Sequence, residues 1–316
     1  MKIQSLFCIA CCSLLLGSTV FAQRSVKKHK RATPPEFKPN EFSGVFFSDA
    51  VSQLQGEMPN AQLAIAESAT RENGRGTPVA DPTAPANASS IWKQLISASS
   101  IEDIVKESKT RLDGMITTPA KFTGGVVDVR KEFTLLASAM AVIALYPEEI
   151  RWQSSASYAQ RIFSKMAMNC KVGTQPVFNE AKQRQTDLQN LLKGSKLTGA
   201  AEDVTWADTA DRGPSMQIME WALRDNLAKA TNSEKNFRES QEEVIKYAEL
   251  LAMFGNIIKQ PGMTDADDQE YAKFAIAMTR AAQEAAQAAR TNDAELARTA
   301  VGRIDQACTK CHETYR

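Results

Sequence analysis

The chain has 316 residues and almost balanced charge, with 38 lysines and arginines against 37 aspartates and glutamates. Its length and its 43% content of apolar residues allow one large or two ordinary globular domains. A net charge of +1 provides no bulk attraction to nucleic acid, so that class of partner is not indicated.

Residues 1–22 have the pattern of a secretory signal peptide. A mostly apolar run from Ile3 to Val20 follows Lys2, and Ala22 offers a small residue for cleavage. An uncleaved membrane anchor is the alternative, because the run is close to the length that spans a bilayer, although small and hydroxyl-bearing residues dilute it. We expect cleavage after Ala22, and therefore a periplasmic or otherwise exported protein.

Cleavage of this peptide would change the cysteine count. Three of the six cysteines lie in residues 1–22, and Cys170, Cys308 and Cys311 remain. Three thiols cannot form a disulfide framework. For Cys170 we expect a buried small side chain, with an intermolecular disulfide as the alternative.

Residues 23–90 have the composition of a tail or linker. A basic cluster, KKHKR at positions 27–31, is followed by the Pro- and Ala-rich stretch TPVADPTAPANASS. The cluster indicates either a solvated charge run that includes His29, or contact with an anionic membrane surface.

From residue 91 onward the apolar spacing is helical, without a convincing run of strands. Apolar residues recur at steps of three and four along several segments, which predicts amphipathic helices. In the second half, Gly, Pro, Asn and Asp punctuation predicts helices over 214–230, 237–259, 266–290 and 293–314. Four helices joined by short turns indicate an all-α, up-and-down bundle.

The first half resembles a copy of the second half. Trp92 matches Trp206 at an offset of 114, and Leu112 matches Leu227 at 115. A series of offsets that drifts by so little predicts a duplication with small insertions in turns. We therefore expect two tandem four-helix bundles, at residues 91–200 and 201–316.

The stretch CTKCHETYR, at positions 308–316, carries the clearest chemistry. Leu296, Ala300, Ile304 and Cys308 follow one another at steps of four. Cys311 and His312 come three and four residues after Cys308, so both thiols and the imidazole share one side of the helix. Cys-x-x-Cys-His is the signature of a c-type haem site, in which both thiols bond the haem and the histidine is an axial iron ligand. A single such motif predicts one covalent haem c per chain.

Three other interpretations of this motif stay open. A redox-active Cys-x-x-Cys is expected at a helix N-terminus in a βαβ unit, unlike this helical context. Structural zinc needs four ligands, and only the distant Cys170 and His29 could complete the set. A disulfide between Cys308 and Cys311 would form in an oxidising compartment.

The same nine residues resemble the C-terminal segment of cytochrome c′, in which Cys-x-x-Cys-His and a following Tyr-Arg lie on the fourth helix of a four-helix bundle. The resemblance covers roughly residues 206–316. It implies thioether links at Cys308 and Cys311, His312 as the proximal iron ligand and Arg316 as a basic group near the proximal face. Arg212 and Arg224 are candidate partners of the haem propionates.

The first half lacks the corresponding residues. Its matching segment, residues 192–196, reads LKGSK and contains neither a thiol nor an imidazole. We expect this half to be haemless and to serve as a structural or partner-binding module.

Two functions follow from a haem in the second half. The first is one-electron transfer by an exported monohaem cytochrome with a redox partner protein. The alternative, implied by the resemblance, is binding of nitric oxide or carbon monoxide at a five-coordinate iron. We do not expect a catalyst, because peroxidase-like chemistry usually needs a distal base and His312 is the only histidine after residue 29.

The face opposite His312 decides the coordination of the iron. The resemblance places it on the first helix of the bundle, where Met216, Met219 and Leu223 are spaced by three and four. Methionine is a haem ligand, but such a stripe is more often packing. We therefore expect an apolar pocket and five-coordinate iron, with Met219 as the sixth ligand if this expectation fails.

Overall fold

A computed structural model describes residues 90–199 and 204–315 of the chain. These residues form helices and connecting turns, and no strand occurs within the two ranges. None of their helices is long and apolar enough to cross a membrane. The predicted signal peptide, the predicted tail up to residue 89 and Arg316 lie outside the described residues.

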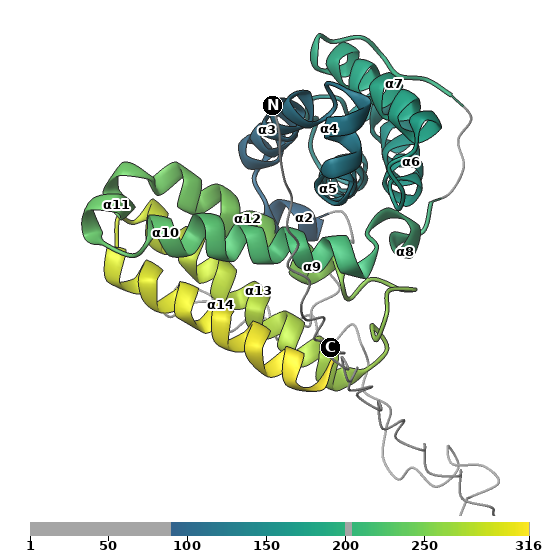
Figure 1. The fold of residues 1–316 in the computed structure, drawn as a ribbon. Helices are drawn as coiled ribbons and strands as arrows, with labels where there is room; N and C mark the ends of the chain where they lie inside the picture. Colours follow the sequence, from purple (N-terminus) through teal and green to yellow (C-terminus); the bar gives the residue numbers. More distant parts are fainter. Residues whose placement is uncertain (1–89, 200–203, 316) are drawn as a thin grey trace, which may run out of the picture. The chain divides into compact units, whose positions relative to one another are not determined.

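Four long helices of the first half form a closed bundle (Figure 1, blue to teal). The helices of this half are α2 (Ser90–Leu95), α3 (Ala98–Met115), α4 (Pro119–Gly124), α5 (Val126–Ala144), α6 (Gln153–Asn169) and α7 (Gln175–Leu192). Contacts run from α3 to α5, from α5 to α6, from α6 to α7 and from α7 back to α3. Each long helix therefore has two long neighbours, as a four-helix bundle requires.

The second half forms a bundle with the same connectivity (Figure 1, green to yellow). Its helices are α8 (Trp206–Thr209), α9 (Arg212–Glu220), η2 (Trp221–Leu227), α10 (Ala228–Ala230), α11 (Glu234–Glu239), α12 (Gln241–Ile257), α13 (Gln269–Arg290) and α14 (Ala294–Thr314). Because α9, η2 and α10 follow without a break, they make one continuous helix that contacts α12, and α14 returns to η2. The all-α prediction is confirmed.

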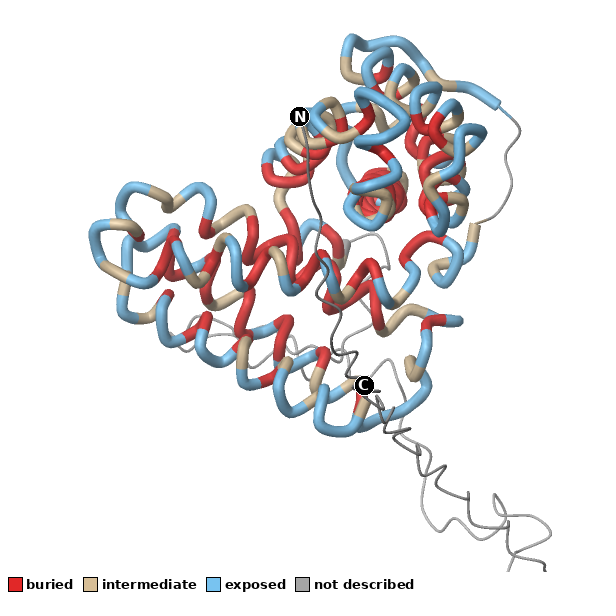
Figure 2. Tube along the Cα trace, in the orientation of Figure 1, coloured by how far each residue is buried: buried red, intermediate tan, exposed pale blue. Residues whose placement is uncertain are grey.

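The inner helix of each half is buried over most of its length. In α5 nearly every residue from Val129 to Ile143 is buried, and α12 is buried in the same way from Tyr247 to Ile257 (Figure 2). These helices carry consecutive apolar residues, so neither of them has a wide polar face. Both helices therefore pack against neighbours on several sides.

Helix ends differ from the predicted ones where a side chain caps the backbone. The helix predicted from residue 266 begins at Gln269, because Asp268 accepts hydrogen bonds from the backbone N–H of Glu270 at 2.7 Å and of Tyr271 at 3.4 Å. The helix predicted from residue 237 begins at Gln241, after the separate short helix α11. These shifts leave the order of the long helices unchanged.

The first long helix of the second half contains a π-helical turn, η2, that α3 lacks. The starts of the two helices, Ala98 and Arg212, are 114 positions apart, whereas their ends, Met115 and Ala230, are 115 apart. A π-turn accommodates one additional residue within a helix by widening its hydrogen-bonded ring. The sequence predicted that the insertions between the two halves lie in turns. The one additional residue found here lies inside a helix instead.

Helices of the two halves also contact each other, α3 and α2 with α12 and α5 with α9. Glu249 of α12 is 5% exposed. Its carboxylate accepts hydrogen bonds from the backbone N–H of Ser97 at 3.1 Å and from the Ser97 hydroxyl at 2.7 Å, and it pairs with Arg290. The rings of Trp92 and Trp206 contact each other at an interplanar angle of 37°, with their centroids 5.4 Å apart. The described residues therefore lie in one compact unit.

Candidate functional site

The motif residues lie on the last turns of α14. Asp293 caps the start of this helix by accepting a hydrogen bond from the backbone N–H of Leu296 at 2.9 Å. A buried stripe of small and branched side chains then runs to Ala307 and holds α14 against α13. Cys308 continues this stripe as a half-buried side chain, and the half-buried Cys311 and exposed His312 follow on the same side.

Both thiols and the imidazole line one cavity of about 270 Å³. Its wall is formed by the continuous helix α9–η2, by α13 and α14, and by Ile258 directly after α12. The lining includes Met216, Met219, Glu220, Leu223, Arg224, Ile258, Phe274, Ala275, Met278, Ala307, Cys308, Cys311 and His312. The cavity is therefore mainly apolar, with sulfur and imidazole groups on one wall and charged groups at Glu220 and Arg224.

The two thiols are free and protonated at neutral pH. Burial, together with the nearby Asp305 and Cys311, raises the pKa of Cys308 to about 11 against an opposing effect of Arg224. Burial also raises the pKa of Cys311. Redox-active Cys-x-x-Cys pairs have a lowered thiol pKa, so this environment does not favour thiol–disulfide exchange.

Comparison with known families agrees with this geometry. The sequence profile of the family described as Cytochrome C' matches residues 208–316, about a third of the chain. The C-terminal bundle is cytochrome c′-like. No curated protein and no solved structure shows significant similarity to the chain. The match indicates a c-type cytochrome domain that binds haem, and it does not extend into the first half.

The cavity of the cytochrome c′-like bundle fits a covalently bound haem. Two thiols three residues apart match the two bonds that c-type attachment requires, and the imidazole of His312 lines the same cavity. Met278 places its sulfur 3.9 Å from the Cys308 sulfur, so the attachment wall is apolar and sulfur-rich. This donor set suits iron porphyrin better than structural zinc, which takes four protein ligands.

The residues expected opposite His312 line the same cavity of the cytochrome c′-like bundle. Met216 and Met219 project from α9 and Leu223 from η2. Met219 is 6% exposed, so its thioether is held within the wall. The sequence predicted that these three side chains share one face of a helix, and all three line the cavity.

The two arginines proposed as propionate partners differ in position. Arg224 lines the cavity and forms an ion pair with Asp305 of α14, which joins η2 to α14 beside Cys308. Arg212 does not line it. Its guanidinium donates to Asp265 at 2.6 Å and to the backbone oxygen of Tyr315 at 2.8 Å. Arg224 is therefore the better placed of the two for a carboxylate at the cavity.

Sequence reasoning missed the contribution of α13. Phe274, Ala275 and Met278 line the cavity, and Gly255 of α12 allows α13 to approach closely at this point. The spacing of Tyr271, Ala275 and Met278 by four and three was visible as a helical stripe. It did not distinguish a cavity wall from ordinary core packing.

Proposed function

We propose that the protein is an exported monohaem c-type cytochrome that transfers single electrons. The observation that carries this proposal is the cavity in which the single Cys-x-x-Cys-His motif of the chain faces an apolar wall. When bound, haem supplies an iron that gains and loses one electron. The protein's own residues hold the group, orient it and set its surroundings.

Each motif residue has a separate role in this proposal. The sulfurs of Cys308 and Cys311 would hold the haem covalently, and a ring nitrogen of His312, on the same helix, would bind its iron. The Met and Leu side chains of α9 and η2 exclude water from the opposite side. Arg224, now paired with Asp305, offers positive charge to a propionate.

Gas binding is the second candidate function, and one feature of the cavity favours it. The wall formed by Met216, Met219 and Leu223 contains no imidazole or hydroxyl group. Such a wall would suit a neutral diatomic ligand such as nitric oxide or carbon monoxide if the iron kept an open coordination position. Its helices also carry no histidine that could serve as a distal base, although Glu220 lines the cavity, so we propose a carrier or gas-binding protein rather than a catalyst.

Replacing Met219 with alanine tests whether Met219 is a ligand of the iron. We expect a high-spin spectrum in the resting protein, and we expect Met219→Ala to leave it high-spin, because Met219 packs in the wall rather than bonding the iron. Absorption and electron paramagnetic resonance spectra measure the spin state. Met263→Ala is the control, since Met263 is also buried, at 8% exposure, but does not line the cavity.

A low-spin resting spectrum that Met219→Ala alone converts to high-spin would contradict the five-coordinate assignment. It would identify Met219 as the sixth ligand and favour electron transfer, because His/Met ligation raises the potential. A reversible one-electron redox titration supports the leading function in either case. Carbon monoxide binding without reversible electron transfer would support the alternative.

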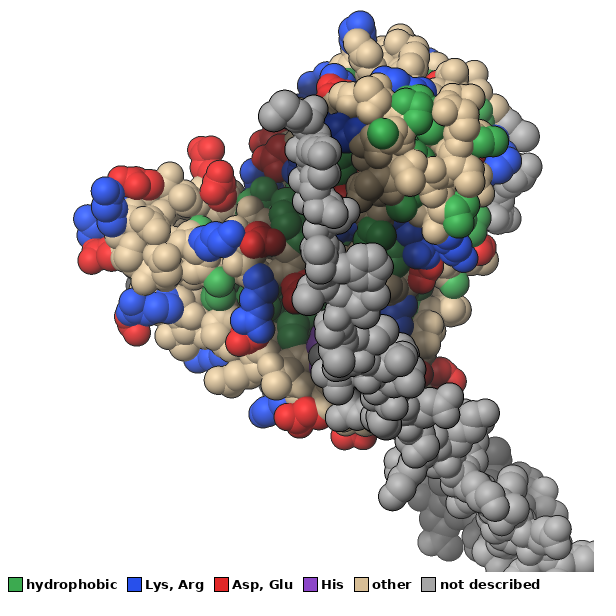
Figure 3. All heavy atoms as spheres, viewed as in Figure 1, with side chains coloured by type: hydrophobic (Ala, Val, Ile, Leu, Met, Phe, Trp, Pro, Cys, Tyr) green, Lys and Arg blue, Asp and Glu red, His purple; other side chains and the backbone are tan. Residues whose placement is uncertain are grey.

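Export and surface contacts complete the proposal. We propose removal of residues 1–22, a periplasmic location, contact of the basic cluster at 27–31 with an anionic membrane, and a redox partner protein. A nucleic-acid partner is not part of it, since basic and acidic side chains are interspersed on the face drawn in Figure 3.

We expect the purified exported protein to begin at Gln23, which mass spectrometry can determine. An N-terminus at Met1 would instead support the uncleaved anchor.

A further inference from the structure

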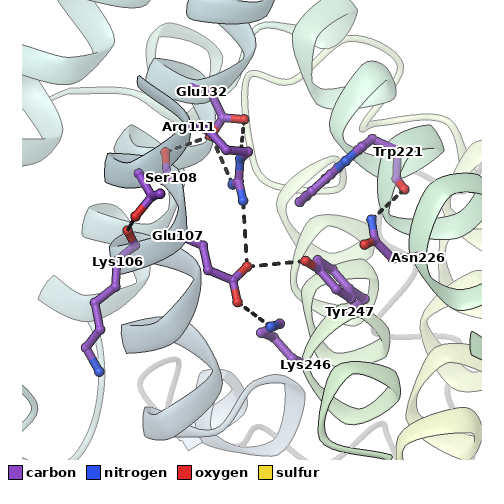
Figure 4. Close-up of polar contacts among 10 residues, drawn as sticks. Lys106, Glu107, Ser108, Arg111, Glu132, Trp221, Asn226, Lys246 and Tyr247 are labelled. Atoms are coloured by element: carbon purple, nitrogen blue, oxygen red, sulfur yellow. Dashed lines mark hydrogen bonds and ion pairs between the residues drawn. The ribbon is translucent and has the colours of Figure 1, made fainter. Parts of the chain in front are cut away.

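The first half of the chain contacts the π-turn that supplies part of the cavity wall. Arg111 of α3 lies over the ring of Trp221, with its guanidinium carbon 4.7 Å from the ring centroid. Trp221 is the first residue of η2, and Leu223 and Arg224 of the same turn line the cavity. Figure 4 shows Arg111 and Trp221 facing each other across the two halves.

Arg111 is fixed in this position by a buried carboxylate of the first half. Its guanidinium donates to the two oxygens of Glu132, at 2.7 Å and 3.0 Å. Glu132 is 2% exposed and also accepts from the Ser108 hydroxyl at 2.7 Å. A bidentate pair of this kind restricts the orientation of a planar guanidinium. Arg111 therefore presents a rigid face to Trp221.

Trp221 is held from a second side by α12. Its ring meets that of Tyr247 edge to face, with centroids 5.2 Å apart. The Tyr247 hydroxyl donates to Glu107 of α3 at 3.2 Å, and Lys246 forms an ion pair with the same carboxylate. The tryptophan thus lies within contacts from α3 and α12 (Figure 4).

The π-turn links the contacts of Trp221 with Arg111 and Tyr247 to the cavity. Met219 lies two residues before Trp221, and Leu223 lies two residues after it. The side-chain amide of Asn226 donates to the backbone oxygen of Trp221 at 3.0 Å, which ties the end of the turn to its beginning. A displacement of Trp221 therefore moves the backbone that carries the cavity-lining residues.

We propose that Arg111 is a positioning residue for the haem cavity. It acts through Trp221 to fix the η2 turn, and the first half thereby sets the wall opposite His312. The inference rests on the proposed function only where it concerns the effect of Arg111 on ligand binding at the haem. Its mechanical part concerns the protein alone and has a readout that does not depend on a signal from haem.

The test compares Arg111→Ala with Arg290→Ala in the full chain. Arg290 also pairs with a buried glutamate, Glu249, in the region where the halves meet, but it has no contact with Trp221. We expect hydrogen exchange of residues 216–227, measured by mass spectrometry, to rise in Arg111→Ala and to stay at the wild-type level in Arg290→Ala. Urea unfolding of both variants measures the stability loss that they share.

The haem-bound protein gives a second readout. A less constrained wall opens the side opposite His312 more often, so we expect Arg111→Ala to raise the rate constant of carbon monoxide association about threefold to tenfold. The effect should disappear in a Trp221→Leu background, because Arg111 acts through that ring. Arg111→Lys provides a milder variant should alanine prevent folding, and it should give a smaller change in the same direction.

The outcomes separate this inference from the proposed function. Purified protein without haem would refute the proposed function, while exchange of residues 216–227 would still decide the role of Arg111. Wild-type exchange in Arg111→Ala refutes the inference. So does an equal effect of Arg111→Ala and Arg290→Ala on both exchange and carbon monoxide association, which would show a purely stabilising role.

Discussion

Replacing both Cys308 and Cys311 with alanine is expected to abolish covalent haem attachment. The two thiols line the same cavity, and the sequence contains no second Cys-x-x-Cys-His motif that could substitute for them. Extraction with acid and organic solvent should therefore remove all haem from the double variant and none from the wild type. Absorbance of the protein fraction after extraction measures the retained haem. The expected stoichiometry in the wild type is one haem per chain.

Cys170 provides the matched control for this experiment. It is 1% exposed, lies directly after α6 in the first half, and its pKa is raised to about 12 by burial. Cys170→Ala should keep a full complement of covalent haem. Retention of haem by the Cys308/Cys311 double variant would disprove the attachment site. Loss of haem in Cys170→Ala at unchanged stability would show that a third thiol takes part.

Replacing Gly255 with alanine is expected to destabilise the fold and disturb the cavity together. A Cβ atom at Gly255 would lie 2.3 Å from Thr279 Oγ1 and 2.9 Å from Met278 Cε, both on α13. Thr279 donates to the backbone oxygen of Ala275 at 2.8 Å, so moving its side chain breaks a buried hydrogen bond. Overpacking of this kind costs about 1–3 kcal/mol. Urea unfolding measures the change in the free energy of unfolding.

Gly302→Ala is the control, because Gly302 is also a helical glycine but has open space around it. Alanine there should raise the free energy of unfolding by about 0.5–1 kcal/mol, since glycine is the poorer helix former. Met278 lines the cavity, so we also expect Gly255→Ala to alter the haem spectrum and Gly302→Ala to leave it unchanged. Equal stabilisation by both substitutions would show that α12 and α13 can separate without cost.

Helical periodicity accounts for the success of the fold prediction. The buried stripes of α13 and α14 repeat at three and four residues, and this signal depends only on which side of a helix faces the core. The π-turn left no such signal. Leu223 and Leu227 are both buried and are four residues apart, as in an ordinary α-helix, so the pattern did not reveal the widened turn between them.

The candidate site was predictable on one wall and hidden on others. Cys308, Cys311 and His312 are adjacent in sequence, and helix geometry alone places them together. Arg111 and Trp221 are far apart in the chain and carry no shared motif, so only packing of the two halves brings them into contact. Met278 was hidden for another reason, because methionine on a helical stripe is common in any core.

The carboxylate of Glu249 limits where the chain can be divided. The segment that matches the family profile, residues 208–316, contains Glu249 and Arg290 but not Ser97. A fragment cut at that boundary would lose both hydrogen bonds that Ser97 donates to Glu249, and it would lack both Trp206 and its partner Trp92. The cytochrome c′-like segment is thus recognisable by itself in sequence, but in this chain its inner helix α12 also packs against α2 and α3 of the first half. A chain without the first half would expose the surface of α12 that α2 and α3 now cover.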